Sequence, residues 1–144
     1  MGTSVVDLPL LVRGFKKAYI RFDQAAKESD SEAAFHALFE ALAWTYVVDQ
    51  GLKRPAQSEL RGLRFVRNRV HHRWADALFL DTGGVSFPIT FPVVFFEWRW
   101  RPVKDLPRGQ KEGLHEYESH LVNHPARVTL GTVLDYLRDQ GYLG

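Results

Sequence analysis

The residues best suited to chemistry lie between Arg67 and His72, where the chain reads Arg-Asn-Arg-Val-His-His. An arginine guanidinium can hold a phosphate through two parallel hydrogen bonds. A histidine imidazole can accept or donate a proton near neutral pH. Asn68 and His72 are four residues apart, so a continuous helix would bring their side chains together on one face. The segment therefore predicts a site for cleaving phosphodiesters, with Arg67, Asn68 and His72 as its catalytic residues.

Basic charge is concentrated around this segment. Residues 53–73 contain seven basic residues and one acidic residue, a net charge of +6, although the whole chain carries only +2. The remaining residues must therefore carry −4. Such a local excess favours a polyanion partner, and RNA is the natural one, with Arg61, Arg69 and Arg73 as further contacts. The alternative is a basic helix face that is simply solvated.

Length and composition set the broad class. A chain of 144 residues is expected to form one domain, residues 1–144, with a sizeable core. Cysteine is absent, which excludes disulfides and cysteine-based metal sites and fits a reducing, cytoplasmic location. We expect no membrane partner, because no apolar run approaches the roughly 18 residues that span a bilayer.

The hydrophobic pattern predicts a mainly α protein, an antiparallel bundle of four to five helices. Asp30 or Ser31 can cap the second helix, and Gly51 can end it. The third helix is predicted to run from Ser58 to the turn at Thr82. The expected helices are residues 5–27, 31–50, 58–81, 110–121 and 129–139.

Residues 83–104 break the helical pattern and predict a short β-like or extended insertion. Pro88 and Pro92 argue against a central strand. From Phe96 to Arg101, aromatic residues alternate with charged ones, which predicts one packed face and one solvated face. Trp98 and Trp100 are expected to pack on the bundle, although aromatics between cations could also clamp single-stranded nucleic acid.

A helical wheel over the third helix places its apolar residues on one arc and Arg67 at the margin of that arc. Asn68 and His72 then face away from the core, with Phe65 beside His72. Arg64 and His71 are supporting candidates, and His71 is also the rival to His72 as the catalytic histidine. Glu40 could orient one of these side chains. The predicted core residues of this helix are Leu60, Leu63, Val66, Val70, Trp74 and Ala77.

The arrangement of Arg67, Asn68 and His72 resembles the signature of the HEPN superfamily of helical nucleases and nucleotide-binding domains. The resemblance implies a metal-independent endoribonuclease in which the RNA 2′-hydroxyl attacks its own phosphate to give a 2′,3′-cyclic phosphate. It further implies a toxin or defence effector that needs no cofactor and no metal. The expected partners are RNA, a second copy that completes a composite active site, and a separate antitoxin of nucleotidyltransferase type. Phe65 and the second apolar face of the helix at residues 31–50 would supply interface area.

The sequence also allows other interpretations. The chain could be a non-catalytic HEPN domain that binds nucleotides or RNA, or that scaffolds a partner protein. It could also be a helical adaptor that docks through the β-like arm. A metal site is not expected, because the three residues between His115-Glu116 and His120 make the spacing one residue too long for the zinc-protease pattern.

Overall fold

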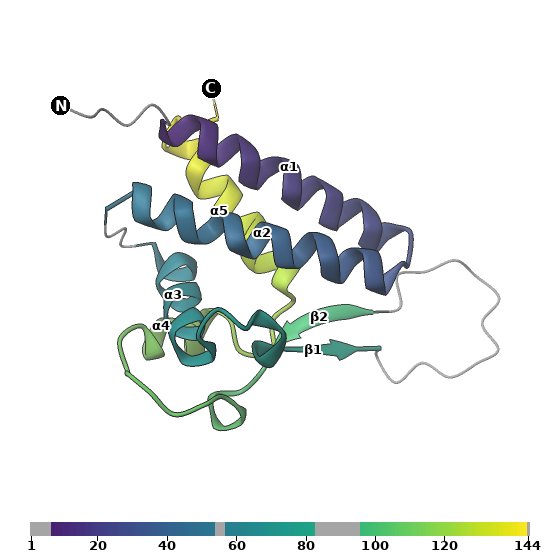
Figure 1. The fold of residues 1–144 in the computed structure, drawn as a ribbon, viewed down its shortest axis with the longest axis vertical. Coiled ribbons are helices and arrows are strands. Elements are labelled where there is room, and N and C mark those ends of the chain that lie inside the picture. Colours follow the sequence, from purple (N-terminus) through teal and green to yellow (C-terminus); the bar gives the residue numbers. More distant parts are fainter. Residues whose placement is uncertain (1–6, 54–56, 83–95, 144) are drawn as a thin grey trace.

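The computed structural model describes residues 7–53, 57–82 and 96–143. Some expectations fall on residues outside these ranges, namely residues 5, 6, 54 and 83–95. The described chain folds into five α-helices, two short 3₁₀ turns and one two-stranded sheet, so the predicted mainly α bundle with a short extended segment is confirmed (Figure 1). The elements are α1 (Leu8–Lys27), α2 (Ser31–Gly51), α3 (Ser58–Val70), η1 (Trp74–Ala77), β1 (Leu78–Asp81), β2 (Glu97–Trp100), η2 (Val103–Asp105), α4 (Leu114–His120) and α5 (Ala126–Asp139).

Helices α1 and α2 form the long antiparallel hairpin of the bundle (Figure 1). An aspartate caps each of them: Asp7 accepts from the backbone N–H of Leu10 at 2.9 Å, and Asp30 from that of Ala33 at 3.0 Å. The predicted cap at Asp30 is therefore confirmed. The second apolar face of α2, with Trp44 and Val48, is covered by the bundle: Val48 is 1% exposed and Trp44 packs against the core. This face therefore does not supply the predicted interface area, whereas Phe39, in the other apolar stripe, is 46% exposed.

Helix α3 ends at Val70, so the prediction of a helix up to Thr82 is wrong. His71 and His72 both adopt left-handed backbone conformations, with φ of 50° and 67°. The chain then forms η1 and β1. The physical reason is tertiary: Trp74 packs edge-on against Trp100 at 6.1 Å, and β1 finds its hydrogen-bond partners in β2, far along the chain.

The two strands pair antiparallel, with Leu78 opposite Trp100 and Asp81 opposite Glu97. Trp100 is fully buried and donates from Nε1 to Thr129 Oγ1 at 3.0 Å. Trp98 packs against Phe35 of α2 at 4.9 Å between ring centres. The predicted packing of both tryptophans on the bundle is confirmed, and Trp100 is not accessible for stacking on a base.

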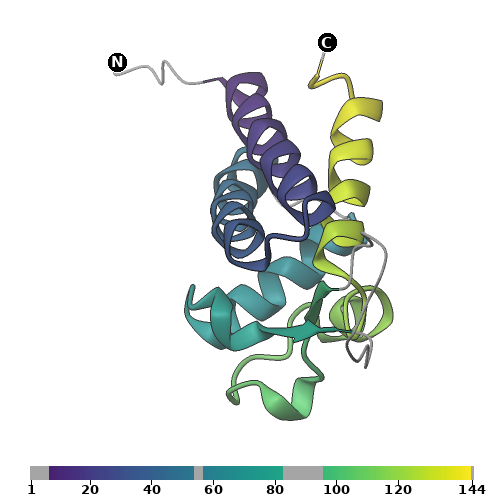
Figure 2. The ribbon, with the colours of Figure 1, turned by 90° about the vertical axis from the view of Figure 1, so that its right-hand side faces the viewer.

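The last two helices complete the core. Helix α5 runs beside α1 and reaches α3 (Figure 2), and α4 packs on α3. A long connecting segment, residues 101–113, joins β2 to α4 and folds back under α3. In the described part of the chain, no helix combines the length and apolarity needed to cross a bilayer.

Gly113 lies at the end of this connecting segment. Both its backbone conformation and the lack of room for a Cβ atom require glycine there. Its φ is +84°, and an added Cβ would lie 2.6 Å from the Arg61 carbonyl oxygen and 2.9 Å from Phe65 Cβ. Gly141 has nearly the same φ, +85°, but open space around the Cβ position. The two positions therefore separate backbone strain from overpacking.

We predict that Gly141→Ala lowers the free energy of unfolding by about 1 kcal/mol through backbone strain alone. Gly113→Ala should cost about 3 kcal/mol, because overpacking adds to that strain. Urea unfolding followed by circular dichroism measures both. Equal losses would show that the contact between α3 and this segment is not tight.

Candidate anion-binding pocket at the end of α3

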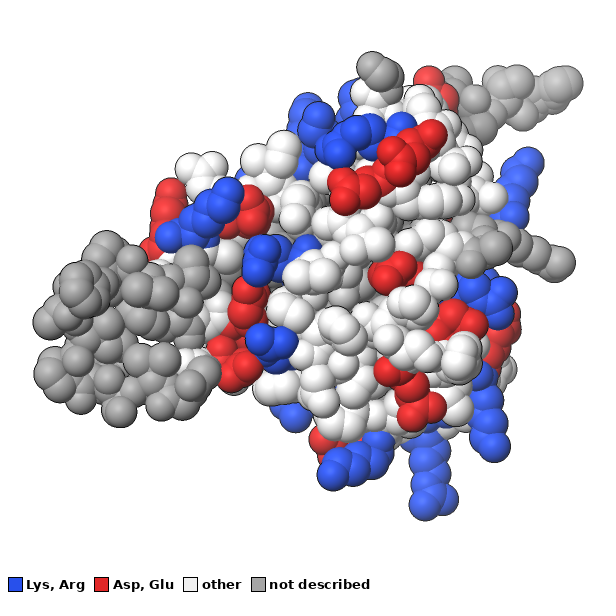
Figure 3. All heavy atoms as spheres, turned by 180° about the vertical axis from the view of Figure 1, so that it is seen from behind, with Lys and Arg blue, Asp and Glu red and all other residues white. Residues whose placement is uncertain are grey.

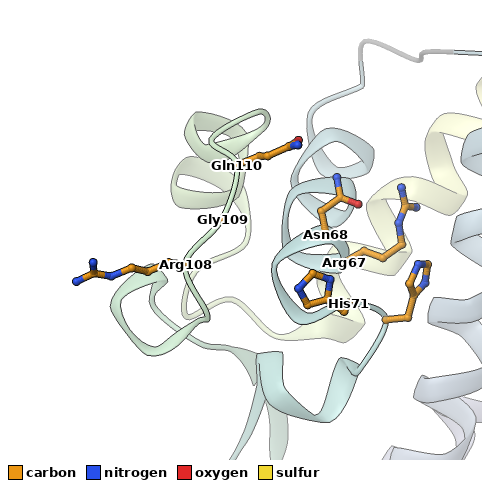
Figure 4. A pocket seen from close by; sticks show the side chains of 7 residues that line it. Arg67, Asn68, His71, Arg108, Gly109 and Gln110 are labelled. Carbon is orange, nitrogen blue, oxygen red and sulfur yellow. The ribbon is translucent and has the colours of Figure 1, made fainter.

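A pocket of about 380 Å³ lies at the C-terminal end of α3 (Figure 4). One wall is the end of the helix and the residues just after it, and the other is the segment before α4. Figure 4 shows Asn68 and His71 facing that segment across the pocket, whereas the Arg108 side chain extends away from them. The lining residues are Arg67, Asn68, His71, His72, Arg108, Gly109 and Gln110. The structure therefore brings the predicted catalytic set of Arg67, Asn68 and His72 to one pocket.

Arg67 lines this pocket, but its side chain is only 10% exposed and runs toward α2, away from the segment before α4 (Figure 4). Its guanidinium lies over the ring of Tyr46, 4.4 Å from the ring centre. Its Nη1 is 3.8 Å from Asp49 Oδ2, too long for a good hydrogen bond, and its buried Nε has no hydrogen-bond partner. Burial lowers the pKa of Arg67, and the nearby Asp49 only partly offsets that effect.

Asp49 is the acidic partner of this site, and its charge is directed mainly to another arginine. Arg64 donates from Nε and Nη2 to the two carboxylate oxygens of Asp49, at 3.0 and 2.9 Å. These hydrogen bonds raise the pKa of Arg64. Asp49 is 5% exposed. Because the carboxylate is already held by a bidentate pair, Arg67 keeps a positive charge that is only loosely compensated.

The predicted acidic residue, Glu40, does not belong to the site. It pairs with Arg21 on the surface of the α1–α2 hairpin. Asp49 was missed, although the sequence contains a signal for it. Leu38, Leu42 and Thr45 form a buried stripe at helical spacing, and Asp49 continues that stripe one turn later. An acid in line with a buried face requires a cationic partner.

The two histidines reach the pocket from outside the helix, so the predicted pairing of Asn68 and His72 through helical spacing is wrong. The His72 ring meets the ring of Tyr46 edge-on, with 5.2 Å between centres. Tyr46 therefore touches both Arg67 and His72 and links the two predicted catalytic side chains. Left-handed conformations cost a non-glycine residue about 1 kcal/mol or more, and such strain is common at functional sites.

Phe65 does not lie beside His72, and it offers no interface area. It is 1% exposed and packs against Tyr117, with 5.2 Å between ring centres. Phe65 lies on the face of α3 that α4 covers, and His72 is no longer on that helix, which ends at Val70.

Arg69 holds the second wall of the pocket and is not free to contact RNA as predicted. It is 8% exposed, and its guanidinium stacks on Phe65 at 4.6 Å. It donates to the backbone carbonyls of Gln110 at 2.9 Å and Pro107 at 3.2 Å. An arginine can satisfy two carbonyls at once because its donors are arranged in a fixed fork. Arg69 is therefore a tether for the segment that faces His71 and Asn68.

The other predicted RNA contacts differ in accessibility. Arg73 has a side chain that is 77% exposed and pairs with Asp76 at 2.9 Å. Arg61 lies 3.6 Å from Glu116, and its Nε is buried without a hydrogen-bond partner. Of these two arginines, Arg73 is accessible next to the pocket, and Arg61 is directed to the α3–α4 contact.

The remaining histidines are not gathered into a site. His120 lies 3.4 Å from Glu59, and His124 contacts the carbonyl of Val122. Over residues 7–53, 57–82 and 96–143, no group of three or more His, Cys, Asp or Glu side chains is arranged to hold a metal ion.

No protein family model matches this chain, and comparisons with curated proteins and with solved structures give no match either. The function is therefore inferred from the geometry of the pocket itself.

The unequal sharing of Asp49 gives a prediction about stability. Asp49→Ala should lower the free energy of unfolding by about 2 kcal/mol, because it leaves two partly buried arginines without a carboxylate. Arg67→Met should leave stability unchanged or raise it, since Arg64 still neutralises Asp49 and a desolvated charge is removed. Urea unfolding measures both changes.

The exposed pair between Arg138 and Asp135 supplies the control, and Asp135→Ala should change stability by less than about 0.5 kcal/mol. A loss in Arg67→Met as large as that in Asp49→Ala would mean that Arg67 serves the fold and is not held in reserve for a ligand.

The tether gives a second prediction. Arg69→Met keeps an apolar chain against Phe65 but removes the hydrogen bonds to Pro107 and Gln110. We expect amide hydrogen exchange to become about tenfold faster or more over residues 107–112, because each lost bond to a charged donor is worth about 1.5 kcal/mol or more. Arg73→Met is the control and should leave this segment unchanged. Equal protection in both variants would contradict the tether.

Proposed function

We propose that this protein is an endoribonuclease of the HEPN type that cuts RNA without a metal ion. In this reaction the 2′-hydroxyl of a ribose attacks the adjacent phosphorus, the bond to the 5′-oxygen of the next nucleotide breaks, and a 2′,3′-cyclic phosphate and a 5′-hydroxyl result. The nucleophile belongs to the substrate, so the protein needs to supply only proton transfer and stabilisation of charge.

The observation that carries this proposal is the state of Arg67. A guanidinium that is buried, loosely compensated and partly without hydrogen bonds is costly to keep in a folded protein. The cost is offset when a phosphate enters the pocket and accepts the unused hydrogen bonds. Asn68, His71 and His72 line the same pocket, and none of its lining residues within 7–53, 57–82 and 96–143 carries a carboxylate. The pocket is therefore suited to a phosphodiester.

Each side chain then has a defined role. Arg67 stabilises the additional negative charge of the five-coordinate phosphorus. His72 moves a proton as general base or general acid, and Asn68 orients His72 or a phosphate oxygen. Tyr46 restricts the side chains of Arg67 and His72 by contacting both. Asp49, which Arg64 holds, determines how deeply the Arg67 side chain is buried. Tyr46, Asp49 and Arg64 act as positioning residues.

We further propose that two copies assemble and bring two such pockets together, as the HEPN resemblance implies. Phe39 of α2, which is 46% exposed, would supply contact area. In this proposal the protein is a cytoplasmic toxin or defence effector, and a separate chain of nucleotidyltransferase type is its antitoxin.

A second candidate function is binding of RNA without cleavage. It is favoured by one observation: His71 and His72 lie beyond the helix, in left-handed conformations, and not on the helical face that the HEPN signature predicts. A pocket with an intact arginine and a displaced histidine would bind a phosphate and leave it uncut.

The deciding test incubates the protein with labelled single-stranded RNA in excess EDTA. We expect cleavage products that end in a cyclic phosphate, and no cleavage of the corresponding DNA. Arg67→Ala should lower kcat/KM by about 10²–10³-fold through lost charge stabilisation. His72→Ala should lower it by about 10²–10⁴-fold through lost proton transfer.

Matched controls are Arg13→Ala on α1 and His115→Ala on α4, two exposed positions away from the pocket. Both should cleave like the unmodified protein. Loss of activity in His71→Ala but not in His72→Ala would exchange the roles of the two histidines. Salt-sensitive binding without cleavage would establish the second candidate instead.

A further inference from the structure

A second depression, of about 540 Å³, lies next to the candidate pocket. Its lining residues are Arg73, Ala75, Asp76, Arg101, Lys104, Asp105, Leu106 and Pro107. The second depression and the candidate pocket have no lining residue in common.

The two depressions share both of their walls. On one side, the candidate pocket ends with His72 and the second depression begins with Arg73. On the other side, the second depression ends with Pro107 and the candidate pocket begins with Arg108. Because the same two chain segments line both, the depressions are consecutive parts of one groove, which we call the α3–η2 groove.

The groove is basic along its length. Five cations line it, Arg67, Arg108, Arg73, Arg101 and Lys104, against two carboxylates, Asp76 and Asp105, which leaves a net charge of +3. Asp76 is engaged by Arg73 in an exposed pair, and such pairs exchange readily for another anion. The connecting segment lies at the lower end of the molecule in Figure 1. Figure 3 shows basic side chains projecting from that end.

The lining of the second depression also indicates what kind of contact it makes. It contains no aromatic residue on which a base could stack and no asparagine or glutamine that could read a base edge. Lysine and arginine at a solvated surface recognise phosphates and carry little sequence information. The depression therefore fits the backbone of a strand whose reacting phosphate lies against Arg67.

We infer that the substrate is single-stranded RNA several nucleotides long, and that its backbone follows the α3–η2 groove from the candidate pocket to Arg73, Arg101 and Lys104. This inference rests on the proposed function, because it takes the pocket at Arg67 as the place of reaction. It assigns Arg73, Arg101 and Lys104 to binding of the flanking phosphates, away from the reacting atoms. The protein therefore discriminates by strand length rather than by base identity at this end of the groove.

The test compares a dinucleotide with a twelve-nucleotide single strand of RNA, in binding and in cleavage. The variant combines Arg73→Ala with Lys104→Ala, both at exposed positions. We expect the Kd of the long strand to rise by about tenfold, and the slope of log K against log salt to fall by about 1.4, because two phosphate contacts are lost. The dinucleotide should be bound and cut as by the unmodified protein.

The control combines Arg13→Ala with Lys17→Ala on α1, which removes the same charge from exposed positions outside the groove. Long-strand affinity that is unchanged in the groove variant, or reduced equally in the control, would overturn the inference. A loss that is equal for the dinucleotide and the long strand would also overturn it. If the unmodified protein binds RNA in this length-dependent way but cleaves nothing, the groove stands and the ribonuclease proposal fails.

Discussion

The neutralisation of Asp49 between α2 and α3 is the constraint on which the site depends. A carboxylate that is 5% exposed requires a cation, and Arg64 supplies one through two short hydrogen bonds. Arg67 lies one turn further along α3, and its contact with the same carboxylate is too long for a good hydrogen bond. One acid between two arginines thus leaves one buried guanidinium only loosely paired.

Tertiary contacts then build a pocket around that guanidinium. Tyr46 lies between Arg67 and His72, so α2 orients both of these side chains from outside α3. Arg69 fastens a segment some 40 residues further along the chain by binding its carbonyls. That segment continues past His72 as the wall of the α3–η2 groove. The two walls of the pocket thus depend on two arginines of a single helix, two residues apart: Arg67 packs against α2, and Arg69 holds the facing segment.

Much of the architecture could be predicted from local patterns. The cap at Asp30 and the packing of Trp98 and Trp100 are properties of short stretches, and the structure has both. The end of α3 could not be predicted in this way. Trp74 and Ala77 fit a continuous helix as well as they fit a 3₁₀ turn, and the choice was made by Trp100 and β2. The errors about His72 follow from that one helix boundary, whereas Phe65 is buried because α4 packs on its side of α3.

The sequence by itself determined which chemistry is available: an arginine, an amide and two histidines within six residues, inside a strongly basic stretch without cysteine. It also determined that Leu60, Leu63, Val66 and Val70 face the core, because helical periodicity is a local property. Only the tertiary structure decided that Asp49 and not Glu40 is the acid of the site, that Arg69 is a tether, and that residues 101–110 line a groove with the end of α3. These outcomes depend on contacts between residues far apart in the chain, whose energies no local pattern contains.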